Sequence, residues 1–397
     1  MEFTKRARSV SPSLTLALTA KTAELKEKGV PVITFGVGEP DFNTPQSIVE
    51  AGKKALDLGH TKYTAASGTP LLKKAICQKL LKDNGLTYGE KQIVVSNGAK
   101  HSLYNCMQIL VEEGDEVIIP APYWLTYPEL VAMCGGKCVF VNCSPQSGFI
   151  MKAEDLRKAI TPKTKVLLLN SPNNPTGAVY SKERLEEIVA VLKDYPNIWV
   201  ISDEIYEKLV YEGNKHYSVA QLGLYDRTII VNGMSKAYAM TGWRIGYCAC
   251  PDNKSASLMA GLQSHQTSNP NSSAQYASAA ALSGEQGFIN DMRDVFDQRR
   301  QLMLEKLSSI KHIKAVKPKG AFYVMIDVSD TFGKSVDGKK IEGAVSFANL
   351  LLEQFYVVTI PCDDFGAPNF LRLSYATNKE NITEGLERLA KFINKIS

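Results

Sequence analysis

The sequence predicts an α/β protein with a mainly parallel, seven-stranded sheet covered by helices on both faces, and with a smaller α+β unit. From about residue 44, short apolar runs alternate with amphipathic stretches, which is typical of a parallel sheet buried between helices. Near residue 290 a long charged stretch breaks this alternation. We therefore expect a large domain over 44–290 and a small domain over 291–397, with residues 1–43 packing against the small domain.

The strands of the large sheet are expected in short runs that are rich in apolar or β-branched residues and bounded by polar or turn-forming ones. The runs are Ile93–Ser96, Glu116–Ile119, Lys137–Val141, Val166–Asn170, Ile198–Ser202, Thr228–Asn232 and Ile245–Cys250. Between them lie helical patterns. Thr44 and Pro45 are expected to cap and open a helix that runs to Leu58. Ser181 is expected to cap a helix with one apolar face, formed by Leu185, Ile188, Val189 and Leu192.

In the smaller unit, helices are expected over about 286–309, 344–355 and 379–396, and strands within GAFYVMIDVS and FLRLSYAT. The last helix carries an apolar stripe made of Ile382, Leu386, Leu389, Ile393 and Ile396. Such an alternation of single strands and helices is typical of a compact α+β unit.

Composition excludes several classes of protein. The 397 residues carry a net charge of only +5, spread along the chain, so nucleic acid is not an expected partner. No run approaches the length of a membrane span, and the N-terminus lacks a signal-like apolar region, so we expect a cytoplasmic protein with no membrane partner. The eight cysteines form no CxxC pair, which indicates reduced thiols and no metal site.

Unusual side chains follow the predicted strands, at the edge where an open α/β sheet binds its ligands. Asn97-Gly98-Ala99-Lys100 opens a helix, whose N-terminus and small residues favour an anion. The other positions on this edge are Trp124, Asn173, Asn174, Asp203, Glu204, Tyr206 and Lys236, joined by Arg244 if its strand is antiparallel. Each has an ordinary explanation alone, such as a cap, a turn or core filling. Together they suit pyridoxal phosphate, which has a phosphate, an aromatic face, a basic nitrogen and a lysine-reactive aldehyde.

Six segments in a fixed order extend this interpretation over essentially the whole chain. They are GVGEPDFNTP (36–45), TKYTAASGTP (61–70), NSPNNPTGAVY (170–180), SDEIYE (202–207), SKAYAMTGWRIG (235–246) and LRLSYA (371–376). With these segments the chain resembles the class I aminotransferases of fold type I, and among them the bacterial aspartate aminotransferases of subgroup Iγ or Iβ.

The resemblance implies a role for each residue at the cofactor. Lys236 binds the pyridoxal phosphate aldehyde and shuttles the substrate proton, for which its amine must be neutral. Asp203 faces the ring nitrogen, Tyr206 and Asn174 bind the phenolic oxygen, and Trp124 stacks on the ring. The phosphate is held by Arg244 and by the turn at Gly98, Ala99 and Lys100.

The resemblance also implies a substrate site shared between two subunits. Arg372 grips the substrate α-carboxylate with Gly38, Trp124 and Asn174 nearby, although its mid-strand position also allows an ion pair within the small domain. Tyr63 reaches the phosphate of a neighbouring subunit, which makes a homodimer part of the site. The implied reaction is a ping-pong transfer of the amino group from aspartate to 2-oxoglutarate.

The chain departs from the animal-type enzymes in one segment. They place a carboxylate-binding arginine after an SNPP-like segment, whereas SNPNSSAQYA (268–277) contains none. We hypothesise that Lys100 binds the distal carboxylate of aspartate, glutamate or a prephenate-like substrate instead; the alternative is a solvated lysine in the first helical turn.

Other functions remain open on the same scaffold. A prephenate or aromatic aminotransferase, a C–S lyase and an aminocyclopropane carboxylate synthase share the cofactor residues. A ligand-sensing regulator would need an added DNA-binding segment, for which the forty or so residues before GEPDF are too few. A dinucleotide dehydrogenase is disfavoured because no GxGxxG follows a strand.

Overall fold

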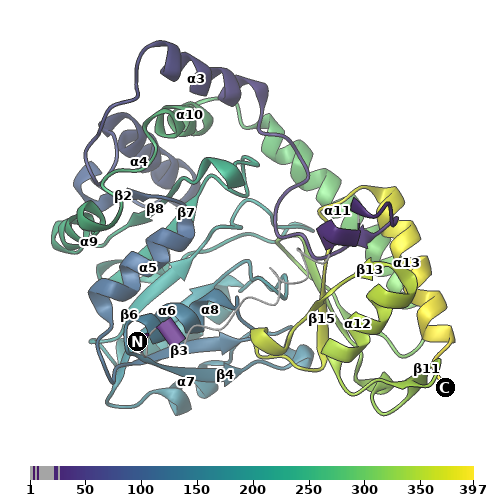
Figure 1. Ribbon diagram of the computed structural model, residues 1–397. Helices are drawn as coiled ribbons and strands as arrows, with labels where there is room; N and C mark the ends of the chain where they lie inside the picture. The colour runs from purple at the N-terminus through teal and green to yellow at the C-terminus, as the bar shows by residue number, and fades with distance from the viewer. Residues whose placement is uncertain (1–2, 5–6, 9–21, 26) are drawn as a thin grey trace.

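The computed structural model describes residues 3–4, 7–8, 22–25 and 27–397. Residues 1–2, 5–6, 9–21 and 26 of the predicted N-terminal segment lie outside the described residues. Figure 1 shows a large sheet flanked by helices and, beside it, a smaller unit built mainly from the C-terminal part of the chain. The fold class predicted from the sequence is confirmed.

Within residues 27–397, seven strands form the large sheet in the order β2-β8-β7-β6-β5-β3-β4. Their bounds lie within two residues of the predicted runs: β2 Ile93–Ser96, β3 Glu116–Ala121, β4 Lys137–Asn142, β5 Thr164–Asn170, β6 Trp199–Asp203, β7 Thr228–Gly233 and β8 Gly246–Ala249. All neighbours are parallel except β8, which is antiparallel to both β2 and β7. The condition that placed Arg244 at the ligand-binding edge is therefore met.

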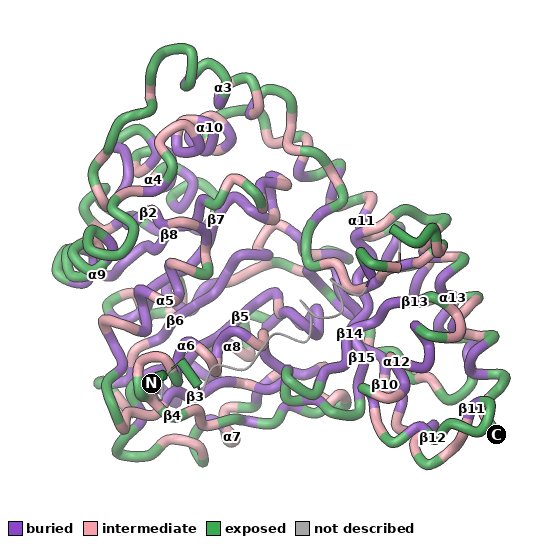
Figure 2. Tube along the Cα trace, viewed as in Figure 1, coloured by how far each residue is buried: buried purple, intermediate pink, exposed green. Residues whose placement is uncertain are grey.

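Helices cover both faces of the large sheet. Alternate residues of β5 belong to different cores: Val166 and Leu168 pack in one core, while Leu167 and Leu169 pack in another. This alternation buries the inner strands from both sides, as Figure 2 shows by their buried colour, whereas the edge strand β4 is largely exposed or half-buried. The helices are α3 Gln46–Asp57, α4 Pro70–Asn84, α5 Ala99–Leu110, α6 Thr126–Met133, α7 Ala153–Ala159, α8 Lys182–Lys193, α9 Asn253–Gln266 and α10 Ser272–Ser283.

One predicted helix cap is right and one is wrong. Ser181 caps α8 by accepting from Arg184 N at 3.3 Å. Thr44 does not cap α3, whose N-cap position is Pro45. The Thr44 hydroxyl instead donates to Ala239 O at 2.7 Å and accepts from Trp243 Nε1 at 3.1 Å. Hydrogen bonds to residues distant in the sequence therefore replace the helix cap that the local sequence predicted for Thr44.

The smaller unit contains a sheet in the order β14-β15-β10-β9, all antiparallel: β9 Lys314–Val316, β10 Tyr323–Asp327, β14 Ile360–Pro361 and β15 Phe370–Ser374. The predicted helices are present as α11 Gly287–Ser308, α12 Ala344–Phe355 and α13 Lys379–Asn394. The short strands are β1 Ile33–Thr34, β11 Ser335–Val336, β12 Lys339–Lys340 and β13 Val357–Val358.

The chain before α3 crosses from one unit to the other. Strand β1 pairs in parallel with β13, and Phe35 is fully buried in the core of the smaller unit. Residues 36–39 then continue toward the edge of the large sheet, where they line a pocket. The domain boundaries themselves stay a prediction.

Two further expectations concern bulk properties. All eight cysteines lie in the described part of the chain and are free thiols there. None of the described helices is both long and apolar enough to cross a membrane. The cytoplasmic location stays a prediction.

Candidate active site

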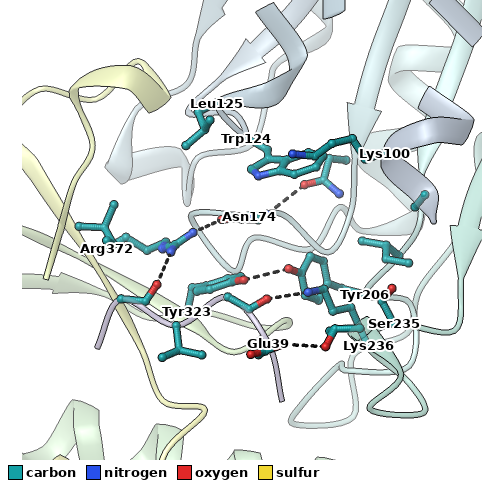
Figure 3. A pocket seen from close by; sticks show the side chains of 18 of the residues that line it. Glu39, Lys100, Trp124, Leu125, Asn174, Tyr206, Ser235, Lys236, Tyr323 and Arg372 are labelled. Atoms are coloured by element: carbon teal, nitrogen blue, oxygen red, sulfur yellow. Dashed lines mark hydrogen bonds between the residues drawn. The ribbon is translucent and has the colours of Figure 1, made fainter. Parts of the chain in front are cut away.

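A pocket of about 630 Å³ lies where the carboxyl ends of the central strands meet the smaller unit, a volume in the usual range for small-molecule sites. Figure 3 shows side chains converging on it from both units. Of the site residues predicted from the sequence, the structure brings ten together as pocket lining: Gly38, Ala99, Lys100, Trp124, Asn174, Asp203, Tyr206, Lys236, Arg244 and Arg372.

Lys236 lies in the turn that follows β7, with its amine in the pocket. Its Nζ donates to Gly38 O at 2.6 Å. Burial, helped by the charges of Arg372 and Arg244 and opposed by Glu39, lowers the pKa of Lys236 to about 8. At this pKa about a tenth of the amine is neutral at pH 7, many times more than for a free lysine.

Asp203 ends β6 and is only 3% exposed. One carboxylate oxygen accepts from the Tyr127 hydroxyl at 2.7 Å and the other accepts from Ile205 N at 3.2 Å. Burial raises the pKa of Asp203 to about 6, although both hydrogen bonds act in the opposite direction. A cation beside this carboxylate would offset the free-energy cost of burying its charge. The site therefore favours a positively charged group there.

An anion cradle forms where α5 meets the turn before β8. Gly98 is the N-cap of α5 with φ 85°, a conformation that favours glycine. A Cβ on Gly98 would lie 2.2 Å from Arg244 Nη2, and a Cβ on Gly246 would lie 2.2 Å from Ala99 N. The two glycines therefore let the Arg244 guanidinium and the first N–H groups of α5 approach one another at the N-terminus of a helix.

Trp124 and Lys100 lie together at one side of the pocket (Figure 3). Lys100 is exposed, with its Nζ 4.9 Å from the centroid of the Trp124 ring. Partial desolvation and the charge of Arg244 lower the pKa of Lys100. The Trp124 ring makes an edge contact with Tyr127, at 5.5 Å between centroids, which holds the indole next to the Asp203 partner.

Arg372 of β15 is 3% exposed and makes no ion pair with a described carboxylate, so the predicted alternative of an ion pair within the small domain is not seen. Its Nη1 donates to Asn174 Oδ1 at 3.0 Å and its Nη2 donates to Gly36 O at 3.1 Å. Its buried Nε has no hydrogen-bond partner among the described residues. A guanidinium that lines a pocket, has no carboxylate partner and keeps one donor without an acceptor suits a carboxylate ligand.

Some residues singled out from the sequence lie outside the pocket. Glu204 is buried behind it, where one carboxylate oxygen accepts from the Ser202 hydroxyl at 2.8 Å. Tyr63 is 89% exposed and lies outside the pocket. Asn173 also lies outside it, and its side chain accepts from Thr176 within the turn. Sequence reasoning missed Glu39, Tyr127 and Tyr323, which do line the pocket. Tyr127 follows Trp124 by three positions at the start of α6, so its place after β3 was the available signal.

A second polar group lies behind the pocket. Among the described residues, Glu204, Glu207 and His216 have potential metal-ligand atoms within 4.8 Å of one another. Both carboxylate oxygens of Glu207 are already occupied, one by the ammonium of Lys79 and the other by Asn84 Nδ2 at 3.1 Å. Because Lys79 supplies a cation to this group, it carries no argument for a metal.

Most of the chain matches a known family. Residues 30–389 match the family model described as aminotransferase class I and II. The chain belongs to the class I and II aminotransferases. Its fold is that of this aminotransferase family.

Individual relatives align over nearly their whole length. An aspartate aminotransferase from Bacillus sp. strain YM-2 is 46% identical over 98% of both chains. An aspartate/prephenate aminotransferase from Cereibacter sphaeroides is also 46% identical over 98% of both chains. The solved structure of an aspartate aminotransferase from Rhizobium meliloti superposes with a TM-score of 0.96 at 43% identity, covering 100% of both chains.

Proposed function

We propose that this aminotransferase binds pyridoxal phosphate in the pocket and transfers the amino group of aspartate to 2-oxoglutarate. The observation that carries the proposal is one pocket containing a lysine of lowered pKa, a buried carboxylate of raised pKa and a buried, unpaired arginine. The names of the relatives support the same reaction. They favour amino-group transfer over a C–S lyase or an aminocyclopropane carboxylate synthase.

The residues present fit this cofactor. The cradle of Gly98, Ala99, Lys100 and Arg244 offers backbone donors and a guanidinium to a phosphate, and only glycine leaves it open at positions 98 and 246. Asp203 offers a carboxylate to a protonated ring nitrogen. Trp124 offers an aromatic face, and Tyr206 and Asn174 offer donors to a phenolic oxygen. When bound, pyridoxal phosphate supplies an aldehyde that captures amines and a ring that accepts electrons from the substrate Cα.

Lys236 has two tasks in this proposal. Its neutral amine would hold the cofactor aldehyde, and when free it would take the proton from the substrate Cα and carry it to the cofactor. Both tasks need the lowered pKa, because a fully protonated amine has no lone pair to offer. Gly38 O, which now accepts from Nζ at 2.6 Å, fixes the amine on the substrate side of the pocket.

Arg372 and Lys100 divide the recognition of a dicarboxylate. Arg372 takes the α-carboxylate, with Asn174 and Gly38 beside it. Lys100, which projects over Trp124 at the mouth of the pocket, takes the distal carboxylate. A solved Thermus thermophilus aspartate aminotransferase with maleate, a dicarboxylate, has a TM-score of 0.93 at 41% identity, covering 99% of this chain and 100% of that chain. Prephenate, another dicarboxylate, is the second candidate substrate, on the strength of the relative from Cereibacter sphaeroides.

A homodimer completes the proposed site. Tyr63 is exposed in the segment between α3 and α4, and Figure 1 shows α3, α4 and α9 at one end of the molecule. Exposed leucines of this region include Leu56, Leu58, Leu71 and Leu262. Exposed apolar side chains that gather over neighbouring elements are typical of an interaction surface. We therefore propose that Tyr63 contacts the phosphate bound by a second copy of the chain.

An absorbance scan of the purified protein loaded with pyridoxal phosphate tests the proposal. We expect a yellow band that disappears when aspartate is added and returns with 2-oxoglutarate, with glutamate as the product. Lys236→Ala should give no such band, and borohydride reduction should fix the cofactor on the peptide containing Lys236. Labelling of another lysine, or a band that aspartate leaves unchanged, would rule out the proposal.

A further inference from the structure

Two buried tyrosine hydroxyl groups, one from the large unit and one from the smaller unit, meet beside the pocket. Tyr206 lies in the turn after β6 of the large sheet, and Tyr323 opens β10 of the small sheet. Their hydroxyl oxygens are 2.9 Å apart and their rings stand at 80° to each other. The exposed fractions of the two residues are 4% and 1%. Figure 3 shows Tyr323 lying between Arg372 and Tyr206.

The number of protons in this pair is limited. A hydroxyl group donates only one hydrogen bond. Burial raises the pKa of both phenols, so both keep their protons at neutral pH. Among the described residues, neither hydroxyl has a hydrogen-bond partner other than the second tyrosine. If Tyr206 donated to Tyr323, it would have no proton left for a ligand oxygen; if Tyr323 donates to Tyr206, the Tyr206 proton is free to point into the pocket.

Arg372 favours donation by Tyr323. The guanidinium carbon of Arg372 lies 4.5 Å from the centroid of the Tyr323 ring. In the β10–β15 pairing Tyr323 is opposite Ser374, so Arg372, two residues along, projects on the same face as Tyr323. The positive charge of Arg372 acts against burial and lowers the pKa of both phenols, but the guanidinium contacts the Tyr323 ring, whereas the charge of Asp203 raises the pKa of Tyr206. Tyr323 is therefore the stronger acid and the better donor.

We propose that Tyr323 is a positioning residue of this active site, whose hydroxyl donates to Tyr206 and thereby directs the Tyr206 proton toward the phenolic oxygen of the cofactor. The inference rests on the proposed function, because it needs a cofactor oxygen beside Tyr206. It links the arginine that binds the substrate carboxylate to the phenol that contacts the cofactor. The link runs through one side chain of the small sheet.

The experiment is a pH titration of the cofactor absorbance in the holoenzyme. A hydrogen bond donated to the phenolic oxygen stabilises the deprotonated chromophore and lowers its pKa. Tyr323→Phe keeps the ring that contacts Arg372 and removes only the hydroxyl. We expect this variant to raise the chromophore pKa by roughly half a unit, and to lower kcat roughly 3- to 10-fold, the effect of losing one neutral hydrogen bond. An unchanged pKa, or a lower one, would overturn the proposal; a lower one would mean that Tyr206 donates to Tyr323.

A double variant separates positioning from a direct effect. If Tyr323 acts only through Tyr206, then Tyr323→Phe should leave the chromophore pKa unchanged when Tyr206 is already phenylalanine. Equal shifts in the two backgrounds would contradict the inference. Tyr375→Phe is the matched structural control: Tyr375 is fully buried and donates to Ala321 O at 3.2 Å, outside the pocket. We expect it to leave the chromophore pKa unchanged.

A change that keeps the Tyr323 hydroxyl but alters its acidity distinguishes the proposed hydrogen bond from a folding defect. Replacing Tyr323 by 3-fluorotyrosine keeps the hydroxyl and strengthens its acidity, so the chromophore pKa should move downward, opposite to the effect of Tyr323→Phe. A shift in the same direction for both variants would overturn the proposal. The spectrum of the unmodified holoenzyme tests the proposed function separately, because it reports cofactor binding and its response to aspartate without any change at Tyr323.

Discussion

Two buried carboxylates four residues apart, Asp203 at the end of β6 and Glu207 in the turn that follows, have pKa values shifted in opposite directions. Burial raises the pKa of Asp203 to about 6. Burial also acts to raise the pKa of Glu207, but the charges of Lys79, Lys208 and His216 outweigh it, so that this pKa falls to about 2. Asp203 faces the pocket and has only uncharged donors, whereas Glu207 faces α4, where Lys79 and Asn84 hold it.

The difference shows how this fold separates a structural charge from a functional one. For Glu207 the chain supplies the countercharge itself, so the pair is complete without a ligand. For Asp203 the chain supplies hydrogen bonds and burial but leaves the positive partner out. A buried charge without a cation is costly in the free protein and becomes favourable when a cationic group binds. The same reasoning applies to Arg372, which is buried without a described carboxylate partner.

The largest expected effect on activity comes from removing the charge of Asp203, the carboxylate without a cationic partner. Asp203→Asn keeps the shape and an acceptor for Ile205 N, but it removes the negative charge opposite the proposed ring nitrogen. We expect kcat for the aspartate half-reaction to fall by about 10³-fold, as for the loss of one preorganised charged group. The apoprotein should be as stable as the unmodified one or more stable, because a desolvated carboxylate is gone. Single-turnover kinetics and urea unfolding of the apoprotein measure the two effects; a large loss of stability would contradict this assignment.

Removing the charge of Glu207, which is paired with Lys79, should lower stability and leave activity nearly unchanged. Glu207→Gln leaves the Lys79 ammonium buried without its carboxylate, so we expect the free energy of unfolding to fall by about 3 kcal/mol while kcat changes little. Asp83→Asn is the matched control, since Asp83 pairs with Lys208 at 2.6 Å in a half-exposed position. That change should cost less than about 1 kcal/mol. Equal losses for the two variants, measured by urea unfolding, would show that Glu207 is not the anchor proposed here.

The pH dependence of apoprotein stability should distinguish the two carboxylates. Because the folded-state pKa of Asp203 is raised from 3.8 to about 6, its contribution to stability is complete below 3.8 and is lost as the pH rises through about 6. Because the pKa of Glu207 is lowered from 4.5 to about 2, its contribution is present above 4.5 and is lost as the pH falls toward 2. Unmodified protein should therefore lose stability relative to Asp203→Asn between about pH 4 and 6. Parallel stability curves for the two proteins over this range would contradict the raised pKa.

The sequence predicted the large sheet closely because its strands are short, apolar and bounded by polar residues, which is a local signal. It also predicted the residues that end or follow a strand, such as Asp203, Lys236 and Trp124, since topology alone brings strand ends to one edge. It did not distinguish the environments of the acids in SDEIYE, because the choice depends on which side chain meets Lys79 of α4. Their roles in catalysis stay proposals.

Residues that reach the site from far along the chain could not be predicted in the same way. Tyr323 belongs to the small sheet, and its place beside Tyr206 depends on how the two sheets meet. Glu39 accepts from Thr241 at 2.6 Å across two segments that no local pattern connects. The incorrect cap at Thr44 has the same origin, since its hydroxyl is bound by residues near position 240. Tertiary contacts decided each of these side chains.

The smallest expected effect extends the comparison to a cation at the mouth of the pocket. Lys100 contacts the Trp124 ring and has no carboxylate partner among the described residues. If an unpaired charge that faces the pocket indicates a ligand of opposite charge, then Lys100→Ala should lower kcat/KM for aspartate about 10-fold relative to an aromatic amino acid. An exposed pair is worth little, so this effect stays below that of Asp203. Lys91→Ala, an exposed lysine outside the pocket, serves as the control. An unchanged ratio would mean that Lys100 is a solvated lysine and that another group selects the dicarboxylate.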